Sequence, residues 1–152
     1  MKEKILISAC LIGENCRYDG KNSLVKELKE LTKYYDLIPI CPEVSGGLKT
    51  PRFPSEIKDD KVISKNDKDV TEFYNNGAYW AKSVCLLYNV KLAILKEKSP
   101  SCGVHQIYDG TFSNNLIEGE GITTKKLKQM HVKVINEKEA VELLHKLNEE
   151  HK

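Results

Sequence analysis

Three of the five cysteines follow apolar segments that have the length of buried strands. Cys10 ends the first segment, Cys41 ends the second, and Cys102 lies in a short loop after the third. Because the carboxyl ends of parallel strands meet at one edge of a sheet, adjacent strands would bring these thiols together. Thiolates are ligands for zinc and for iron-sulfur clusters, so the pattern predicts a metal centre. The alternative is that these cysteines are small buried hydrophobic residues without a chemical role.

The spacing of the cysteines bears on which metal they would hold. The sequence has no C-x-x-C pair, the local signature of structural zinc sites and of bacterial ferredoxins. No histidine or aspartate has ligand spacing in the same three loops, so a closed tetrahedral zinc site would lack its fourth ligand. Three thiolates suit a 4Fe-4S cluster that leaves one iron open for substrate. Zinc bound by three cysteines and a water is an alternative that the spacing leaves open.

Four apolar segments are predicted to form the strands that position these residues. They span residues 5–11, 37–41, 90–95 and 132–135. The first is apolar almost throughout, which is typical of a parallel strand covered on both faces. Pro39 removes a backbone donor from the second segment, which favours a position at the edge of the sheet.

Apolar residues at helical spacing predict helices between and after these strands. The apolar positions of the first helix are Leu24, Val25, Leu28, Leu31 and Tyr35. Those of the second are Val70, Phe73, Trp80, Val84 and Leu87. The expected N-caps are Asn22 or Ser23, Asp69 in a capping box with Glu72, Thr123 before a short helix, and Asn136 before the terminal helix.

Residues 42–68 show no clear periodicity and are rich in proline and glycine. A segment of this length is well beyond the roughly 12 to 15 residues of a plain connection, so it is either a functional lid or a disordered insert. We favour the lid, because it directly follows Cys41.

The alternation of strands and helices predicts one α/β domain over residues 1–152. Right-handed crossovers then give three layers around a doubly wound, mostly parallel four-stranded sheet with strand order 2-1-3-4. The first and third strands flank the point where the chain leaves the sheet in opposite directions. Ligands of such sheets bind outside the carboxyl ends of the strands at this switch point.

The composition limits the classes of protein to which this chain can belong. The 40% hydrophobic content fills one core, and 24 basic against 22 acidic residues leave a net charge of +2. No run of one sign indicates a nucleic-acid or membrane surface. No segment resembles a signal peptide or reaches the ~20 apolar residues of a membrane span, so we expect a cytoplasmic protein with thiols rather than disulfides. We expect a monomer or a weak homodimer.

Longer motifs surround each of the three cysteines. They are SACLIG at 8–13 with RYDG at 17–20, CPEVSGGL at 41–48 with TPR at 50–52, and SPSCG at 99–103 with YDGTF at 108–112. Together they resemble the thiouracil desulfurase family over nearly the whole chain. The resemblance implies a non-redox 4Fe-4S enzyme in which Cys10, Cys41 and Cys102 hold the cluster. The thiocarbonyl sulfur of a thiolated uracil would bind the fourth iron, and hydrolysis would release hydrosulfide.

Hydrolysis of a C=S bond moves protons, so the site needs an acid or base. Glu43 is our candidate, because Pro42 fixes its direction two residues after Cys41. Ser101 adjoins Cys102 and would position the water or donate to a ring oxygen. The alternatives are a solvated loop glutamate and a loop hydroxyl that bonds nearby backbone.

The remaining polar and aromatic residues near the motifs have less definite roles. The only two arginines, Arg17 and Arg52, would hold a loop carboxylate such as Asp19 or Asp109, or a substrate phosphate. The aromatic residues of the motifs, which would stack on a pyrimidine ring or pack against their own loops, are Tyr18, Tyr108 and Phe112.

Three further side chains receive no chemical assignment. Cys16 lies beyond the turn that follows Cys10 and has no role assigned. Cys85 lies on the flank of a helical stripe and is expected to be a packed thiol. His105 follows the Cys102 loop and would either shuttle protons or simply be exposed.

Two other functions remain as alternatives to a desulfurase. One is an iron-sulfur module that binds or senses sulfide without hydrolysis, and the other is a zinc hydrolase that uses the same three cysteines. The sequence does not specify which thiolated compound is used or which ring position is attacked. A direct role on thiolated tRNA is disfavoured because no basic stripe is present.

Overall fold

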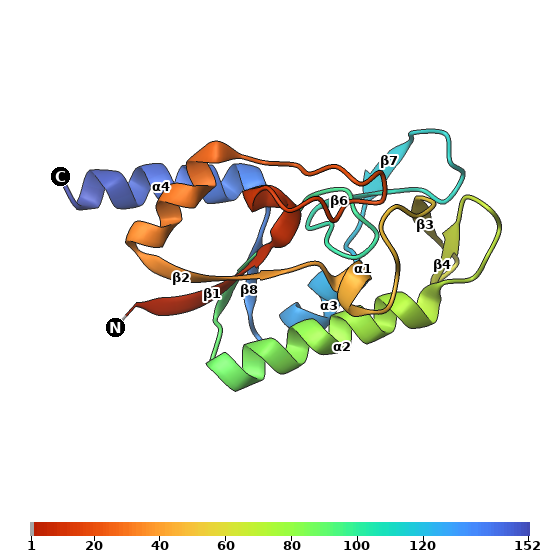
Figure 1. Ribbon diagram of the computed structural model, residues 1–152, viewed down its shortest axis with the longest axis horizontal. Helices are drawn as coiled ribbons and strands as arrows, with labels where there is room; N and C mark the ends of the chain where they lie inside the picture. Colours follow the sequence, from red (N-terminus) through yellow and green to blue (C-terminus); the bar gives the residue numbers. More distant parts are fainter. Residues whose placement is uncertain (1) are drawn as a thin grey trace.

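The computed structural model describes residues 2–152, and a four-stranded parallel sheet runs through its middle (Figure 1). The strand order is β2-β1-β5-β8, which confirms the predicted order. The strands are β1 Glu3–Ser8, β2 Tyr35–Ile40, β5 Leu92–Ile94 and β8 Lys133–Ile135. The edge strand β2 pairs with β1 over its whole length, from Glu3 opposite Tyr35 to Ser8 opposite Ile40.

Helices cover both faces of this sheet, as expected of three layers (Figure 1). The 3-10 helix η2, Lys26–Lys33, and α4, Glu137–Glu150, cover one face, and α2, Thr71–Tyr88, and α3, Ile122–Gln129, cover the other. The side chains of β1 alternate accordingly, with Ile5 and Ile7 in the core under η2 and α4 and Leu6 in the core under α2 and α3. No helix within residues 2–152 is long and apolar enough to cross a membrane.

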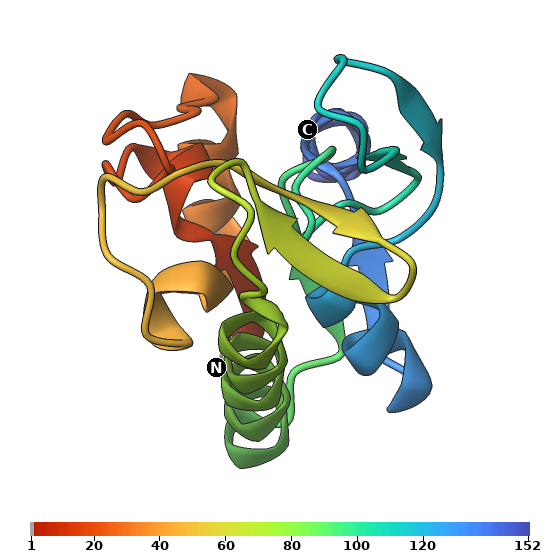
Figure 2. The ribbon, with the colours of Figure 1, turned by 90° about the vertical axis from the view of Figure 1, so that its right-hand side faces the viewer.

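Two antiparallel hairpins extend the molecule beyond the carboxyl ends of the sheet (Figures 1 and 2). One pairs β3, Ser55–Lys58, with β4, Lys61–Ser64, and the other pairs β6, Gln106–Tyr108, with β7, Leu116–Glu118. The first hairpin and the single-turn helix α1, Pro42–Ser45, lie in the segment that we expected to be a lid or a disordered insert. Its turn uses Asp59 and Asp60 at positive φ, so the usual Asn-Gly signal of a two-residue hairpin is missing.

The buried face of α2 differs from the predicted stripe. Phe73, Trp80 and Leu87 are 39%, 55% and 74% exposed. The buried positions of this helix are Tyr74, Gly77, Ala78, Ala81 and Cys85. The prediction was wrong for these three exposed residues, whereas Val84 is partly buried and packs against the core. Apart from Tyr74, the buried positions are small residues that allow close packing. A Cβ at Gly77 would collide with the carbonyl oxygen of Pro42, so this position lets α1 pack directly on α2.

The expected caps of two helices were wrong. The first helix is a 3-10 helix that begins after Val25, and neither Asn22 nor Ser23 caps it. Asn22 instead accepts a hydrogen bond from the backbone of Leu24, which is a local turn. Thr123 lies inside α3 and is fully buried, because the helix begins after Gly121.

Of the other two expected caps, the one at Asp69 does not form as predicted and the one at Asn136 does. Asp69 accepts hydrogen bonds from the backbone and hydroxyl of Thr71, but no capping box with Glu72 forms. Asn136 does cap α4, and its side chain and that of Glu139 accept from each other's backbone amides at 2.9 Å. The predicted N-cap at Asn136 is therefore confirmed, and the structure adds a capping box with Glu139 that the sequence analysis did not predict.

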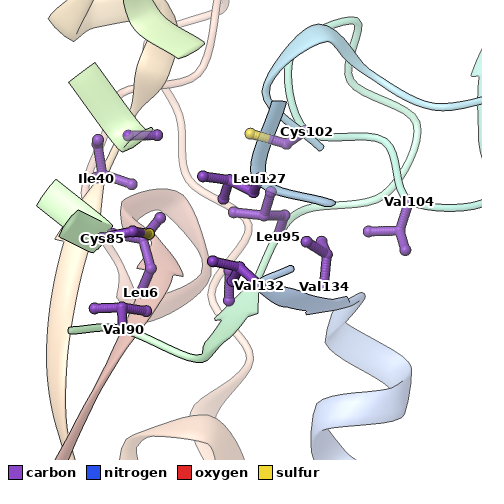
Figure 3. Packing of buried hydrophobic residues seen from close by; sticks show 12 residues of the cluster. Leu6, Ile40, Cys85, Val90, Leu95, Cys102, Val104, Leu127, Val132 and Val134 are labelled. Atoms are coloured by element: carbon purple, nitrogen blue, oxygen red, sulfur yellow. The ribbon is translucent and has the colours of Figure 1, made fainter. Parts of the chain in front are cut away.

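The packed layer under α2 and α3 contains two cysteines in different settings (Figure 3). Cys85 lies among Leu6, Ile40 and Val90 and is 2% exposed, which confirms a packed thiol whose burial raises its pKa to about 11. Cys102 lies at the border of the same cluster, beyond Leu127 and Leu95, and it also lines a cavity at the carboxyl ends of the strands.

Candidate active site at the end of the sheet

A cavity of about 360 Å³ lies beyond the carboxyl ends of β1, β2 and β5. Ser8 at the end of β1, Ile40 at the end of β2 and Lys96 just after β5 are among its lining residues. The volume falls in the usual range for small-molecule sites. The cavity therefore lies at the switch point between β1 and β5, where we predicted the chemistry.

Cys10, Cys41 and Cys102 all line this cavity as free thiols. Cys10 is the second residue of the 3-10 helix η1, Ala9–Ile12, which follows β1 directly, so it does not close the strand as expected. Cys41 is the N-cap residue of α1, directly after β2. Cys10 and Cys102 are buried and Cys41 is half-buried. The fold thus brings together the three cysteines that the sequence singled out.

Cys16 also lines the cavity, although the sequence indicated no role for it. The chain reverses after Gly13, whose φ is +103°, and returns Cys16 to the other thiols. A hydrogen bond with the Cys10 thiol is the main reason that the pKa of Cys16 rises to about 11. The Cys41 thiol in turn donates to the backbone oxygen of Cys16 over 3.7 Å. We call Cys10, Cys16, Cys41 and Cys102 the thiol wall.

The surroundings of Cys16, Cys41 and Cys102 raise the pKa of each thiol and so favour protonated sulfur at these three positions. Burial raises the pKa of Cys102 to about 12, although hydrogen bonds with Ser101 and Ser8 oppose the rise. The hydrogen bond with Cys16, followed by burial, raises the pKa of Cys41 above its usual range. A bound metal would have to displace these protons, as metals do when they bind cysteine.

The donor set around the cavity fits a thiophilic metal group. The thiol wall supplies soft sulfur ligands, and no histidine is among the described residues that line the cavity. Within residues 2–152, no three His, Cys, Asp or Glu side chains are grouped as a single metal ion would require.

Glu43 projects into the same cavity from α1 and is held on both carboxylate oxygens. Its Oε1 accepts from the Tyr74 hydroxyl at 2.8 Å and from Arg52 Nε at 3.2 Å, and its Oε2 accepts from Ser99 Oγ at 3.3 Å. Burial and the neighbouring carboxylate raise the pKa of Tyr74 above its usual range, so Tyr74 remains a donor. Glu43 is therefore a fixed carboxylate, and the alternative of a solvated loop glutamate does not apply.

The two arginines have separate partners. Arg17 pairs with Asp19 at 3.3 Å, one of the two carboxylates that we expected. Arg52 pairs instead with Glu43, and only 8% of its side chain is exposed. Its Nη2 also donates to the backbone oxygen of Cys16 at 2.9 Å, so Arg52 ties the Glu43 carboxylate to the thiol wall.

Ser101 is not placed to act on a molecule in the cavity. It is fully buried, is not among the lining residues, and its hydroxyl lies 2.9 Å from that of Thr123. Ser99 lines the cavity instead, donates to Glu43 and accepts from the backbone amides of Ser101 and Cys102 at 3.1 Å. The structure thus replaces Ser101 by Ser99 as the candidate hydroxyl. Both serines belong to the SPSC motif, but sequence analysis named only Ser101 because it adjoins Cys102, and the fold separates them.

Glu97 fixes the loop that carries Cys102. Its Oε1 accepts from the backbone amides of Val104, His105 and Gln106 at 2.6, 2.9 and 3.1 Å, and its Oε2 accepts from Asn136 at 2.9 Å. Burial raises the pKa of Glu97, but these hydrogen bonds outweigh it and the net effect lowers the pKa. Sequence analysis missed this residue because most of its partners are backbone amides and the remaining one, Asn136, is 39 residues away in the sequence.

The opposite side of the cavity is formed by the hairpins and their loops. We call its residues the hairpin wall: Glu56, Lys65, Tyr108, Phe112 and Asn114. Tyr18, Tyr108 and Phe112, which we expected to stack on a ring or to pack against their own loops, all line the cavity. His105 lies outside, where it is exposed and pairs with Glu139 at 3.0 Å.

Comparison with known proteins agrees with this arrangement. Residues 5–139 match the model of the 2-thiouracil desulfurase family. The chain is 39% identical over 150 residues to the uncharacterized protein YbbK of Bacillus subtilis (strain 168), covering 92% of this chain and 99% of that one. Its structure is similar to that of the 4Fe-4S-dependent thiouracil desulfidase TudS, with a TM-score of 0.89 and 40% identity over 97% of this chain and 99% of that one.

The fold is that of an α/β enzyme, with a cavity at the switch point of its sheet. The chain belongs to the 2-thiouracil desulfurase family, which confirms the resemblance carried by its three cysteine motifs.

Proposed function

We propose that this protein is a 4Fe-4S-dependent desulfurase that hydrolyses the C=S group of thiolated uracil or of a related thiolated nucleobase or nucleoside. The observation that carries the proposal is the meeting of Cys10, Cys41 and Cys102 with Glu43 around one cavity, in a chain of this family. Water would supply the oxygen of the product and hydrosulfide would leave. The reaction transfers no net electrons, so no reductant is needed.

The three cysteines would hold the cluster and leave one iron open. When bound, such a cluster supplies a thiophilic Lewis acid, which makes the carbon of a C=S group more susceptible to water. Cys16 would remain a free thiol beside the ligands. Thiolates bind zinc as well as iron-sulfur clusters, so the donor set alone does not separate the two. The 40% identity to a 4Fe-4S-dependent thiouracil desulfidase supports the cluster over zinc.

The residues around Glu43 would handle the protons. Its Oε2 faces Ser99 and would take a proton from the attacking water, while the Ser99 hydroxyl would hold that water in place. Tyr74 and Arg52 bond the other oxygen and so fix the direction of the carboxylate. Ser99 is itself fixed by two backbone amides of the Cys102 loop, which would keep the water close to the thiol wall.

The deciding experiment is anaerobic reconstitution with iron and sulfide, followed by metal analysis and an assay of hydrosulfide release from 2- and 4-thiouracil. We expect a brown protein with one 4Fe-4S cluster per chain and uracil as the organic product. A colourless, zinc-loaded protein that is active in air would establish the zinc hydrolase instead. A brown protein that releases no hydrosulfide would overturn the proposed activity.

A Glu43→Gln variant separates catalysis from sulfide binding. It should retain the cluster but lose about 10²- to 10⁴-fold in kcat, the usual contribution of a general acid or base. An iron-sulfur module that only binds or senses sulfide would keep its sulfide affinity in this variant. Unchanged turnover in Glu43→Gln would remove Glu43 from the mechanism.

We also propose that the protein works in the cytoplasm as a monomer or a weak homodimer. Light scattering over a range of protein concentrations would test the second point, and a stable dimer throughout that range would contradict it.

A further inference from the structure

Glu56 is a buried carboxylate on the hairpin wall, and sequence analysis did not identify it. It is 8% exposed, lies on β3 and lines the cavity. Its Oε1 accepts hydrogen bonds from the backbone amides of Gly110 at 3.0 Å and Phe112 at 3.1 Å. This one oxygen is enough to hold the 110–112 loop against β3.

The second carboxylate oxygen, Oε2, makes no hydrogen bond or ion pair with any residue from 2 to 152. No side-chain oxygen or nitrogen in that part of the chain is both sealed from solvent and without a partner, so Oε2 must reach open space. Because Glu56 is more than nine-tenths buried and lines the cavity, we take that space to be the cavity. Glu56 therefore presents a hydrogen-bond acceptor to whatever occupies it.

The carboxylate charge of Glu56 restricts which ligands Oε2 favours. Burying a carboxylate is unfavourable unless a cation or several donors compensate it, and no described cation lies within ion-pair distance of Glu56. Two neutral amides on a single oxygen leave the other oxygen without compensation. Such an oxygen favours a ligand that brings an N–H or O–H donor, and a hydrogen bond to a charged group is stronger than a neutral one.

We propose that Glu56 Oε2 accepts a hydrogen bond from the ring N–H next to the C=S group of the substrate. This inference rests on the proposed desulfurase function and narrows its substrates to cyclic thioamides, in which an N–H adjoins the thiocarbonyl. The 4-thiouracil ring has that donor at N3, while its N1 lies away from the C=S group. Tyr108 and Phe112, which line the same cavity, would stack on the ring and hold its edge toward Glu56.

A Glu56→Gln variant tests the acceptor without removing the loop anchor. The amide oxygen of glutamine still accepts from Gly110 and Phe112, and its NH₂ group replaces Oε2 with a donor. We expect KM for 4-thiouracil to rise about 10- to 100-fold, the effect of one lost hydrogen bond to a charged group, with little change in cluster content. Glu118→Gln makes the same exchange on the exposed strand β7 and should leave KM unchanged.

Methylated rings test the same contact in the unaltered protein. 3-Methyl-4-thiouracil lacks the N–H next to the C=S group and should be a poor substrate, whereas 1-methyl-4-thiouracil should be accepted. In Glu56→Gln the gap between the two compounds should close, because the site no longer requires the donor. Binding of uracil and 3-methyluracil by anaerobic equilibrium dialysis gives the same comparison without any chemical step, and only uracil should depend on Glu56.

The outcomes separate the two proposals. If the unaltered protein with an intact cluster releases no hydrosulfide from any thiouracil, the proposed function fails and the substrate assignment fails with it. If it releases hydrosulfide, but Glu56→Gln keeps its KM or 3-methyl-4-thiouracil reacts as well as the 1-methyl compound, only the role of Glu56 is overturned.

Discussion

The thiol wall and the hairpin wall enclose one cavity but are built by different means. The thiol wall follows the ends of parallel strands, so short apolar segments in the sequence determine where Cys10, Cys41 and Cys102 lie. The hairpin wall depends on two short antiparallel ribbons that are distant in the sequence and meet through contacts such as Gly110 against β3. The thiol wall offers soft sulfur, whereas the hairpin wall offers a carboxylate and aromatic rings. This difference suggests that one wall holds the metal and the other selects the substrate.

If that division is correct, the largest effect should come from the thiol wall. Cys102→Ser should take up little or no cluster and lose nearly all activity, because serine is a poor ligand for iron-sulfur clusters. Cys16→Ser is the matched control, since it removes a thiol from the same cavity and should leave iron content near that of the unaltered protein. Iron and sulfide analysis after anaerobic reconstitution measures both. Loss of the cluster in Cys16→Ser would mean that the ligand set is wrong.

The next largest effect should separate the two serines of the Cys102 loop. Ser99→Ala removes the hydroxyl that contacts Glu43 and should lower kcat about 10- to 100-fold, the range for residues that orient a metal site. Ser101→Ala should act mainly on stability, costing about 1 to 3 kcal/mol, because it leaves the buried Thr123 hydroxyl without its partner. Steady-state kinetics and denaturant unfolding of both variants test this. The reverse pattern would restore Ser101 as the residue that positions water.

A smaller effect is expected on the hairpin wall, and in KM rather than kcat. Tyr108→Leu keeps an apolar side chain but removes the ring that would stack on the base. Stacking of a base on an aromatic residue contributes about 1 to 3 kcal/mol, so KM should rise by about 5- to 100-fold. Cluster content should not change. A fall in cluster content with unchanged KM would contradict the division between the walls.

The smallest effect concerns the link between the two walls. Glu97 holds the segment that leads from Cys102 to β6, and its pKa is lowered in the folded protein. As the pH falls, Glu97 therefore takes up a proton in the unfolded chain before it does so in the folded protein. Its contribution to stability is full at neutral pH and is lost from about pH 5 downward. Glu97→Gln should cost about 1 kcal/mol at pH 7 and much less at pH 3. Urea unfolding at the two pH values measures it, and an equal loss at both would exclude the ionised group as the cause.

The contrast between the walls also explains what the sequence could predict. The strand order, the switch point and the N-cap at Asn136 follow from local patterns, and all three are confirmed. The buried face of α2 was mispredicted because Gly77 and Ala78 are selected by a neighbouring element rather than by their own hydrophobicity. Glu56 was missed because its partners are backbone amides, and Glu97 because all its partners but the distant Asn136 side chain are backbone amides. Cys16 was given no role because the sequence does not show that the turn at Gly13 brings it back to the other cysteines.

The contact between Gly77 and Pro42 has a consequence for how this site stays aligned. Cys41 precedes α1 and Glu43 lies within it, so a single helical turn carries both a proposed iron ligand and the proposed base. That turn is seated on α2 with no room for even a methyl group between them. Thermal movement of α1 would therefore shift ligand and base by the same amount and preserve the spacing between metal and proton acceptor. A Gly77→Ala substitution, more than thirty residues along the chain from Cys41 and Glu43, would therefore disturb both residues at once.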